Sequence, residues 1–206
     1  NAGPFNCTDI KPYPYDPEKA KKLLDEAGWV PGPDGIRVAK GAKVAPDGTR
    51  LRLKYSTTSG NKLREDTQVL VVEDMKAIGI DFFIENMPSA ILLGTWADGA
   101  PRYHGNYDII EYSTFAGIDP HNLLFTRWHS KNIPTEANKS GRNETRFSNP
   151  RYDELIDAAG KEPDMAKRKT MYCEAVKIIY DQANVIYLYQ RAAIDSYRDW
   201  LQGWIE

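Results

Sequence analysis

The chain has 206 residues, of which 41% are hydrophobic and 27% are charged, a composition that suits one globular domain of mixed type or two small ones. Its formal net charge of −2 gives no global field that would attract nucleic acid or an anionic membrane, so we expect no nucleic acid among its partners. No apolar run approaches the roughly 20 residues that a membrane-spanning helix needs.

The first predicted element is a helix over residues 16–27. Asp16 is a natural N-cap, Pro17 fits the first helical position, and Gly28 supplies a left-handed stop. Apolar residues recur at helical spacing and form one stripe: Ala20, Leu23, Leu24 and Ala27. Turn-forming residues follow, and a short hairpin-like stretch is expected over 36–44.

A strand, a helix and a second strand are predicted next. Residues 50–57 alternate between apolar and polar side chains, which indicates a strand with one face in water. Residues 80–87 form another strand pattern. Between the two strands, residues 62–78 have helical spacing, with five apolar residues expected to point inward: Leu63, Leu70, Val71, Met75 and Ile78. Because the links are short, this order favours a right-handed crossover between parallel strands.

The remaining sequence predicts a short helix (88–100), a strand (107–115), two helices (149–160 and 164–183) and two strands (185–190 and 192–197). Residues 116–148 are rich in Gly, Asn, Ser and Pro and have little periodicity, which is typical of a long functional or mobile loop. Together these elements predict an α/β fold, with a mixed sheet of four to five strands flanked by helices.

The two cysteines leave the question of a disulfide bond open. Cys7 and Cys173 suffice for one bond, but nothing in their spacing demands it. Cys173 lies in a helical pattern, where a small buried apolar group is the simpler interpretation. Two cysteines fit a cytoplasmic or an exported bacterial protein, and they exclude a disulfide-dense small secreted domain.

Motifs of enzymes and metal sites are absent from the sequence: there is no phosphate-binding loop, dinucleotide fingerprint, zinc-protease motif, Cys-x-x-Cys pair or nucleophile elbow. The three histidines, His104, His121 and His129, have no converging ligands at suitable spacing, so we expect no metal and no cofactor. Asp98 and Asp108 lie near strand ends, where the paired carboxylates of glycosidases can sit. A hydrolase that uses these two residues is therefore kept as an alternative of a different class.

The aromatic content is high, with five Trp and twelve Tyr. Many aromatic residues fall within 96–129, interleaved with Asn, Ser, Thr and Arg: Trp96, Tyr103, Tyr107, Tyr112, Phe115, Phe125 and Trp128. Such a group can form a wall that stacks on a ligand, or it can pack into the core. A flat exposed aromatic patch would instead indicate a protein-interaction module.

A helix and turn motif near the start of the chain reads "YDPEKAKKLLDEAGW", followed by "PGPDG". A strand, helix and strand unit reads "LRLKYSTTSGNKLREDTQVLVVEDMKAIGIDFFIENM", and the next strand and its D-P loop read "GNYDIIEYSTFAGIDPHNLL". Two late helices and a following strand read "NETRFSNPRYDELIDAAGKEPDMAKRKTMYCEAVKIIYDQANVIYLYQR". In this order, along almost the whole chain, these motifs resemble the family 5 extracellular solute-binding proteins.

The resemblance implies the type II fold of periplasmic binding proteins, in which two lobes enclose a cleft. It covers only the second half of such a receptor. We therefore expect residues 1–15 to be a crossover from a missing first lobe, residues 16–194 to be the second ligand-binding lobe, and residues 195–206 to return toward the first lobe. Both ends should then lie near each other on one face.

The same resemblance implies a receptor without catalysis. Such proteins serve bacterial ABC importers of peptides, nickel and oligosaccharides: the ligand binds between the lobes, a hinge closes, and the closed receptor docks on a membrane permease. The implied partners are a small-molecule or peptide ligand, the permease and the first lobe of the same chain, and the implied state is a monomer. The implied location is the periplasm, or the cell exterior with a lipid anchor in a Gram-positive organism.

The implied ligand-binding set consists of Ser89, Trp96, Arg102, Tyr112, Ser113, Thr114, Phe115, Ala116, Gly117 and Asp119. Peptide receptors of the family place an acid shortly before the D-P pair, to bind the free amine of the peptide. Here Ala116 or Gly117 stands at that position. This difference leaves an oligopeptide as the expected ligand, with an oligosaccharide or an opine as alternatives. Arg102 aligns with a basic cleft position and is expected to meet an anionic group, or else to form a surface ion pair.

Overall fold

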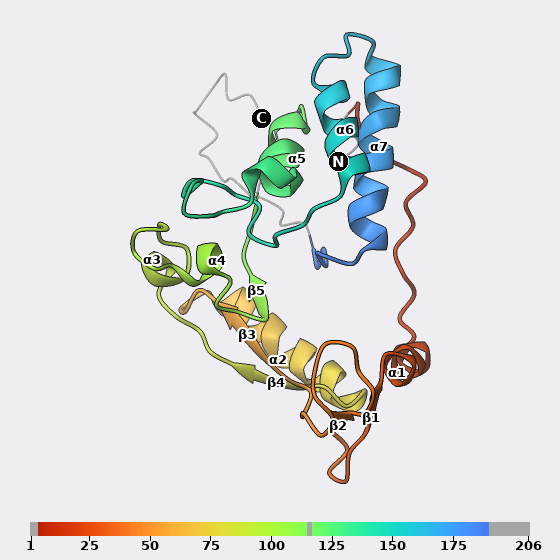
Figure 1. Ribbon diagram of the computed structural model, residues 1–206, viewed down its shortest axis with the longest axis vertical. Helices are drawn as coiled ribbons and strands as arrows, with labels where there is room; N and C mark the ends of the chain where they lie inside the picture. The colour runs from red at the N-terminus through yellow and green to blue at the C-terminus, as the bar shows by residue number, and fades with distance from the viewer. Residues whose placement is uncertain (1–3, 115–116, 190–206) are drawn as a thin grey trace, which may run out of the picture.

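A computed structural model describes residues 4–114 and 117–189 of the chain. Figure 1 shows a sheet-bearing part, which runs from α1 to β5, and a helical part, which contains α5, α6 and α7. The N-terminal segment lies beside α7 before it crosses to α1 (Figure 1). Among these residues, no helix is both long and apolar enough to cross a membrane.

The first helix, α1 (Pro17–Glu26), is confirmed together with its cap. The Asp16 carboxylate accepts a hydrogen bond from the Lys19 backbone N–H at 2.9 Å. Gly28 follows the helix at φ +84°, and a Cβ atom there would come within 2.6 Å of the Ala42 nitrogen. Glycine is therefore required both by the backbone conformation and by the close approach of the hairpin.

The strands form two small sheets. β3 (Arg52–Thr57) lies between β4 (Asp81–Ile84) and β5 (Ile109–Glu111), and both pairings are parallel. β1 (Trp29–Pro31) and β2 (Arg37–Ala39) form an antiparallel hairpin. It meets the larger sheet region through a bridge between Val38 and Arg50 and through backbone hydrogen bonds of Arg37 with Leu51 and Gly79. The described residues thus hold five strands, divided between two sheets instead of joined in one mixed sheet.

The crossover helix α2 (Lys62–Ala77) links β3 to β4, as predicted. Its inward face is only partly the predicted one. Gln68 is the one fully buried residue of α2, and Leu63 and Leu70 are 48% and 64% exposed, whereas Ile78 is buried as predicted. The Gln68 side-chain amide donates to the Tyr55 carbonyl oxygen and exchanges hydrogen bonds with the Asn86 side chain. The most buried side chain of α2 is therefore polar, which the apolar pattern did not predict.

The segment after β4 contains two short helices, α3 (Ser89–Leu92) and α4 (Pro101–His104), in place of one helix over 88–100. A turn separates them, in which the Asp98 carboxylate accepts hydrogen bonds from the Thr95 N–H and hydroxyl. The expected loop over 116–148 also contains a helix, α5 (His121–Trp128), and a short 3₁₀ turn, η1 (Ser130–Asn132). The prediction of a purely irregular stretch was wrong.

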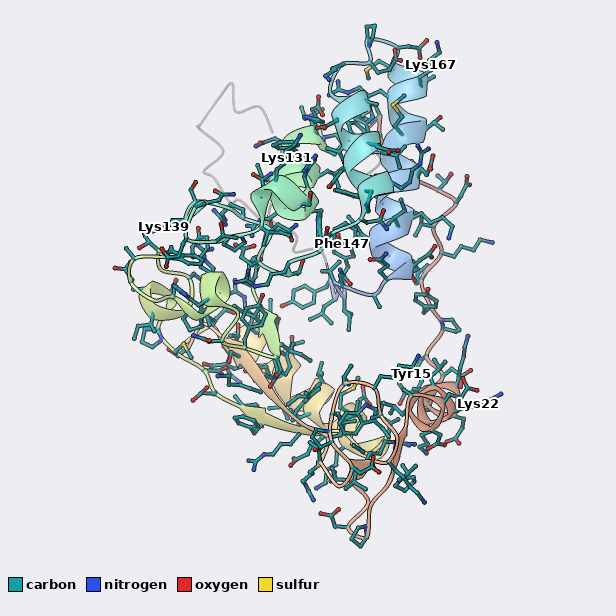
Figure 2. All side chains as sticks on the ribbon, viewed as in Figure 1. Tyr15, Lys22, Lys131, Lys139, Phe147 and Lys167 are labelled. Atoms are coloured by element: carbon teal, nitrogen blue, oxygen red, sulfur yellow. A yellow bond between two sulfur atoms is a disulfide. The ribbon has the colours of Figure 1, made fainter. Side chains whose placement is uncertain are left out.

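The helical part contains the larger apolar core. α6 (Pro150–Ala159) and α7 (Met165–Asp181) pack against each other, and both are capped by the side chain that precedes them. Phe147, labelled in Figure 2, lies in this part. Its ring packs edge-on against the rings of Trp128 and Tyr152. The buried cluster consists of Leu124, Trp128, Phe147, Tyr152, Leu155, Ile156, Ala159, Tyr172, Ala175 and Ile179.

A disulfide bond joins Cys7 to Cys173 on α7, with the two Cα atoms 5.5 Å apart. The interpretation of Cys173 as a buried apolar thiol was therefore wrong. The same N-terminal segment stacks Tyr13 on Tyr180, with ring centroids 4.7 Å apart. Because the partners lie more than 160 residues apart in sequence, no local pattern could reveal this pairing.

The strand predicted over 185–190 is not formed by the described residues 185–189. Ile186 and Tyr187 are 73% and 66% exposed and pair with no strand of the described part of the chain. A strand needs such a neighbour for its backbone hydrogen bonds, so an apolar pattern alone was not sufficient. The strand predicted over 192–197 lies outside the described residues.

Candidate functional site

The carboxyl ends of the parallel strands β3 and β5 bring several polar side chains together. The Thr57 hydroxyl donates to the Glu111 carbonyl oxygen at 2.8 Å, and the Tyr55 hydroxyl donates to the Glu111 carboxylate at 2.7 Å. Burial raises the pKa of Glu111, while the hydrogen bond from Tyr55 and the charge of Arg64 oppose the rise. This edge therefore carries a partly buried carboxyl group that the sequence analysis missed.

Tyr112 and Ser113 follow β5 and belong to the predicted ligand-binding set. The Ser113 hydroxyl accepts a hydrogen bond from Arg64 Nη2 at 3.1 Å. The Tyr112 hydroxyl accepts from Arg127 Nη1 at 2.9 Å and donates to the Glu144 carboxylate at 3.4 Å. Burial, and then the charge of Glu144, raises the pKa of Tyr112, which keeps its hydroxyl protonated. Both hydroxyls are thus oriented by arginine side chains.

A pocket of about 380 Å³ lies next to these residues. It is lined by Thr114, Gly117, Asp119, Asn122, Leu123, Thr126, Arg127 and Arg142. The pocket unites three predicted residues, Thr114, Gly117 and Asp119, with residues of α5 and the following loop that the sequence analysis missed. Phe115 and Ala116 were also predicted, and they lie outside the described residues.

Asp119 is the carboxylate in the lining of this pocket, and it is already paired. It accepts a hydrogen bond from the His121 N–H at 2.9 Å and forms an ion pair of 2.6 Å with Arg168 of α7. Burial acts to raise the pKa of Asp119, but the hydrogen bond and the arginine outweigh it and leave the pKa below its usual value. Asp119 therefore serves first to join the loop before α5 to α7.

Three other predicted residues do not line this pocket. Ser89 begins α3 and is exposed, and Trp96 stacks on the His104 ring, with centroids 4.2 Å apart. Arg102 of α4 is largely buried, and its Nη1 lies 3.9 Å from the Glu144 carboxylate. Of these three side chains, Arg102 is the one that reaches the charged groups beside the pocket, and its contact is a buried one instead of a surface ion pair.

Glu144 is the central acceptor of these charged groups, and its side chain is 4% exposed. It accepts hydrogen bonds from Arg127 at 2.8 and 3.1 Å and from Arg142 Nε at 3.1 Å. The Tyr107 hydroxyl donates to the Glu144 carbonyl oxygen at 2.9 Å, and burial raises the pKa of Tyr107 to about 12. The neighbouring Asn143 fixes the loop through hydrogen bonds to the carbonyl oxygens of Trp128, His129 and Phe147.

The alternative of a hydrolase that uses Asp98 and Asp108 does not fit these contacts. Asp98 is exposed, and the hydrogen bonds from Thr95 lower its pKa, whereas a general acid needs a raised one. Asp108 is also exposed and accepts a hydrogen bond from the Lys54 N–H at 2.7 Å. Both carboxylates hold local structure, which is a correction to the interpretation as a catalytic pair.

The three histidines lie in different surroundings. His104 stacks on Trp96, His121 lies close to the Phe125 and Tyr172 rings, and His129 is buried near Asp153 and Asp157. Across residues 4–114 and 117–189, no group of three or more His, Cys, Asp or Glu side chains is placed to hold a metal ion. Of the aromatic group, Tyr103 and Trp128 are buried, so these two rings pack into the core and form no exposed patch.

Comparisons with known proteins agree with this architecture. The family model described as bacterial extracellular solute-binding proteins, family 5 Middle, matches residues 2–135. Di/tripeptide-binding protein 2 of Pseudomonas aeruginosa is 32% identical over 200 residues, which cover 95% of this chain and 32% of that protein. Protein XP55 of Streptomyces lividans is 31% identical over 166 residues, which cover 81% of this chain and 27% of that protein.

Among solved structures, the oligopeptide-binding protein of Thermus thermophilus complexed with a pentapeptide superimposes with a TM-score of 0.77 and 30% identity, covering 88% of this chain and 31% of that one. This likeness confirms the predicted fold class, part of a type II periplasmic-binding-protein fold. The chain spans about a third of the length of the curated relatives it matches. It belongs to family 5 of the bacterial extracellular solute-binding proteins.

Proposed function

We propose that the chain is the ligand-binding second lobe of a receptor that captures a solute for an ABC importer and delivers it to a membrane permease. The observation that carries this proposal is the pocket of about 380 Å³ beside the end of β5, in a chain of this family. Residues 16–194 form the lobe, and residues 1–15 and 195–206 are crossovers to a first lobe. Ligand closes the two lobes only through contacts that it makes with both.

The proposed ligand is an oligopeptide or a related solute. Its support is that relatives of this chain are named as a di/tripeptide-binding protein and as an oligopeptide-binding protein complexed with a pentapeptide. The lack of an unpaired carboxylate among the described lining residues supports a second candidate, an oligosaccharide or opine. Asp119, the carboxylate in the lining, is paired with Arg168 and is not free to bind a peptide amine. The binding residues within this lobe are the predicted set from Ser89 to Asp119, joined by residues of α5.

Location and assembly follow from the same proposal. The receptor works in the periplasm, or on a lipid anchor outside a Gram-positive cell, as a monomer that docks on its permease. It carries out no chemical reaction, because a receptor of this kind only binds, closes and releases. Arg64, Arg102 and Arg127 orient the polar groups that meet the ligand.

A thermal-shift screen tests this function on the complete receptor chain, meaning the longer chain that also supplies the first lobe. Peptides of two to five residues, oligosaccharides and opines are added one class at a time. We expect one class to raise the melting temperature by several degrees at concentrations far above its Kd. A screen in which no class moves the melting temperature would contradict the proposal.

The 206-residue chain serves as the comparison in that screen. It offers only the contacts of one lobe, while the loss of translational and rotational freedom on binding is unchanged. We therefore expect weak binding or none for the same ligands. Sub-micromolar binding by this chain alone, measured by calorimetry, would contradict the assignment of the ligand to a site between two lobes.

A further inference from the structure

Three arginine side chains surround one buried carboxylate at the junction of the sheet-bearing and helical parts. Arg127 donates to both oxygens of Glu144, Arg142 donates to one of them, and Arg102 lies 3.9 Å from the same group. The three side chains come from α5, from the loop before α6 and from α4. One carboxylate therefore holds together guanidinium groups from three separate segments.

The charges of this cluster do not balance. Three guanidinium groups around one carboxylate leave a formal excess of two positive charges. Among the described residues, the hydrogen bonds of Arg102 go to neutral oxygens, the Gly94 carbonyl and the Tyr103 hydroxyl, and its Nε is buried without a partner. The Arg102 and Arg127 side chains are largely buried, and buried positive charge is costly unless an anion compensates it. The imbalance thus points to a second anion.

Two of these arginines have hydrogen-bond donors left over. A guanidinium group carries five N–H donors in a rigid fork. Within the described parts of the chain, Arg127 uses only Nη1 and Arg142 uses only Nε. Both side chains line the pocket of about 380 Å³. Glu144 thus orients the two guanidinium groups and leaves part of each fork for a molecule in that pocket.

The carboxylate that could otherwise neutralise the pocket is engaged elsewhere. Asp119 lines the pocket but pairs with Arg168 at 2.6 Å. The remaining lining residues are neutral, and Thr114, Asn122 and Thr126 add hydroxyl and amide groups beside the arginines. A pocket of this composition selects a planar anion that accepts two parallel hydrogen bonds.

We propose that Arg127 and Arg142 bind a carboxylate group of the transported solute in this pocket, with Glu144 as the residue that positions both arginines. The inference rests on the proposed receptor function and names the chemistry of its ligand. The carboxylate can be the main-chain terminus of a peptide or an acidic side chain, since both present the same planar group.

The first test detects a carboxylate-binding site without assuming a natural ligand. The melting temperature of the complete receptor chain is measured in succinate, in phosphate and in sodium chloride at equal ionic strength. We expect succinate to stabilise the protein more than chloride or phosphate does, and Arg142→Gln to remove that difference. Equal stabilisation by all three salts, or an unchanged succinate effect in the variant, would overturn the inference.

Arg142→Gln suits this test because the one hydrogen bond that the Arg142 side chain makes to the described residues is with Glu144. The side chain is also 37% exposed, so the variant should fold. Arg151→Gln is the matched control: Arg151 lies on α6 and pairs with Glu154 and Glu174 at the surface. It should keep the full response to succinate. As a second readout, the Nε–Hε signals of Arg127 and Arg142 in a nitrogen–proton NMR spectrum should move with succinate, and their failure to move would count against the site.

The second test distinguishes the two sources of the carboxylate, the main-chain terminus of a peptide and an acidic side chain. Calorimetry on the complete receptor chain compares trialanine, trialanine amide and Ala-Glu-Ala amide. Loss of the charged hydrogen bonds should weaken binding of trialanine amide by about tenfold or more. Recovery of affinity with Ala-Glu-Ala amide would assign the pocket to an acidic side chain, and no recovery would assign it to the main-chain terminus.

The outcomes distinguish this inference from the proposed function. Equal binding of all three peptides would overturn the carboxylate site and leave the receptor function standing. A response to succinate, without binding of any peptide, oligosaccharide or opine, would support the site and contradict the receptor function. Absence of both responses would contradict both.

Discussion

The helical part and the sheet-bearing part of the chain bury different kinds of side chain. The interior formed by α5, α6 and α7 is one continuous apolar cluster that includes Tyr152, Ile156 and Ile179. Around the sheet, many of the buried side chains are polar: Arg37, Ser56, Thr57, Thr58 and Gln68. One part is stabilised mainly by packing, and the other depends more on a network of hydrogen bonds.

The two parts also differ in how far their surfaces are covered by other segments of the chain. The N-terminal segment is cross-linked to α7 by the disulfide bond and by the stacking of Tyr13 on Tyr180. In the sheet-bearing part, apolar side chains of α2 and β4 remain exposed: Leu63, Val69, Leu70, Phe83 and Ile84. The candidate site lies where the two parts meet, so a rigid apolar unit holds α5 against a polar sheet edge.

The largest expected effect is a cavity in the helical core. Ile156 is fully buried, so Ile156→Ala should lower the free energy of unfolding by about 3–4 kcal/mol. Urea denaturation measures this change, and Ile84→Ala on β4 is the control. Ile84 is 45% exposed, and its loss should cost less than about 1 kcal/mol. Similar costs for the two variants would refute the contrast in packing.

Removal of the disulfide bond should have the second-largest effect on the free energy of unfolding. Cys7→Ser with Cys173→Ser opens a loop of 166 residues in the unfolded chain, which should cost about 2–4 kcal/mol. Urea denaturation of the oxidised parent, the reduced parent and the double variant provides the measurement. The reduced parent should match the variant. If the oxidised parent is no more stable than either, the bond does not stabilise the helical part.

A polar substitution tests the sheet-bearing part. Gln68→Leu should cost about 1–3 kcal/mol, because it leaves the buried Asn86 side chain without its partner. The double variant Gln68→Leu with Asn86→Leu should recover part of the loss. Recovery should be incomplete, because Asn86 also accepts a hydrogen bond from the Thr57 N–H. Additive costs in this cycle would show that the two side chains act independently.

Elements set by local pattern could be predicted from the sequence, as α1 shows. The caps Asp16, Asn149 and Asp164 each act within three residues, so their helices were found with nearly correct ends. The disulfide bond and α5 were missed. The bond joins distant segments, and α5 has no side-chain cap and begins after Pro120 in a polar stretch.

The pocket lining contains expected residues where the chain leaves β5 and unexpected residues where the lining depends on tertiary contact. Thr114, Gly117 and Asp119 belong to the expected ligand-binding set, follow β5 and line the pocket. Arg142 and Glu144 lie in the loop before α6, and their role arises from contacts with α4 and α5. The charged sequence "GRNETR" could have drawn attention to these two residues, but it does not indicate which side chains they contact.

The smallest expected effect concerns Glu111, whose carboxyl group was also missed. Burial raises its pKa above the value in the unfolded chain, against the opposing influence of Tyr55 and Arg64. The folded state therefore holds this proton more tightly than the unfolded state does. Its contribution is complete below the unfolded pKa and is lost as the pH rises through the folded pKa. Above that pH range, the partly buried, ionised Glu111 lowers the free energy of unfolding by a small amount that no longer changes with pH.

Glu111→Gln removes this titration and retains an oxygen that can accept the Tyr55 hydroxyl. The variant should be slightly more stable than the parent at pH 7, and the difference should vanish below the usual carboxyl range. The effect should be the smallest of the four because the side chain is only partly buried. Thermal unfolding of both proteins between pH 3 and pH 7 measures it. A variant that is less stable at pH 7 would show that the charged hydrogen bond outweighs the cost of burial, which would make the sheet edge a polar network that favours ionisation.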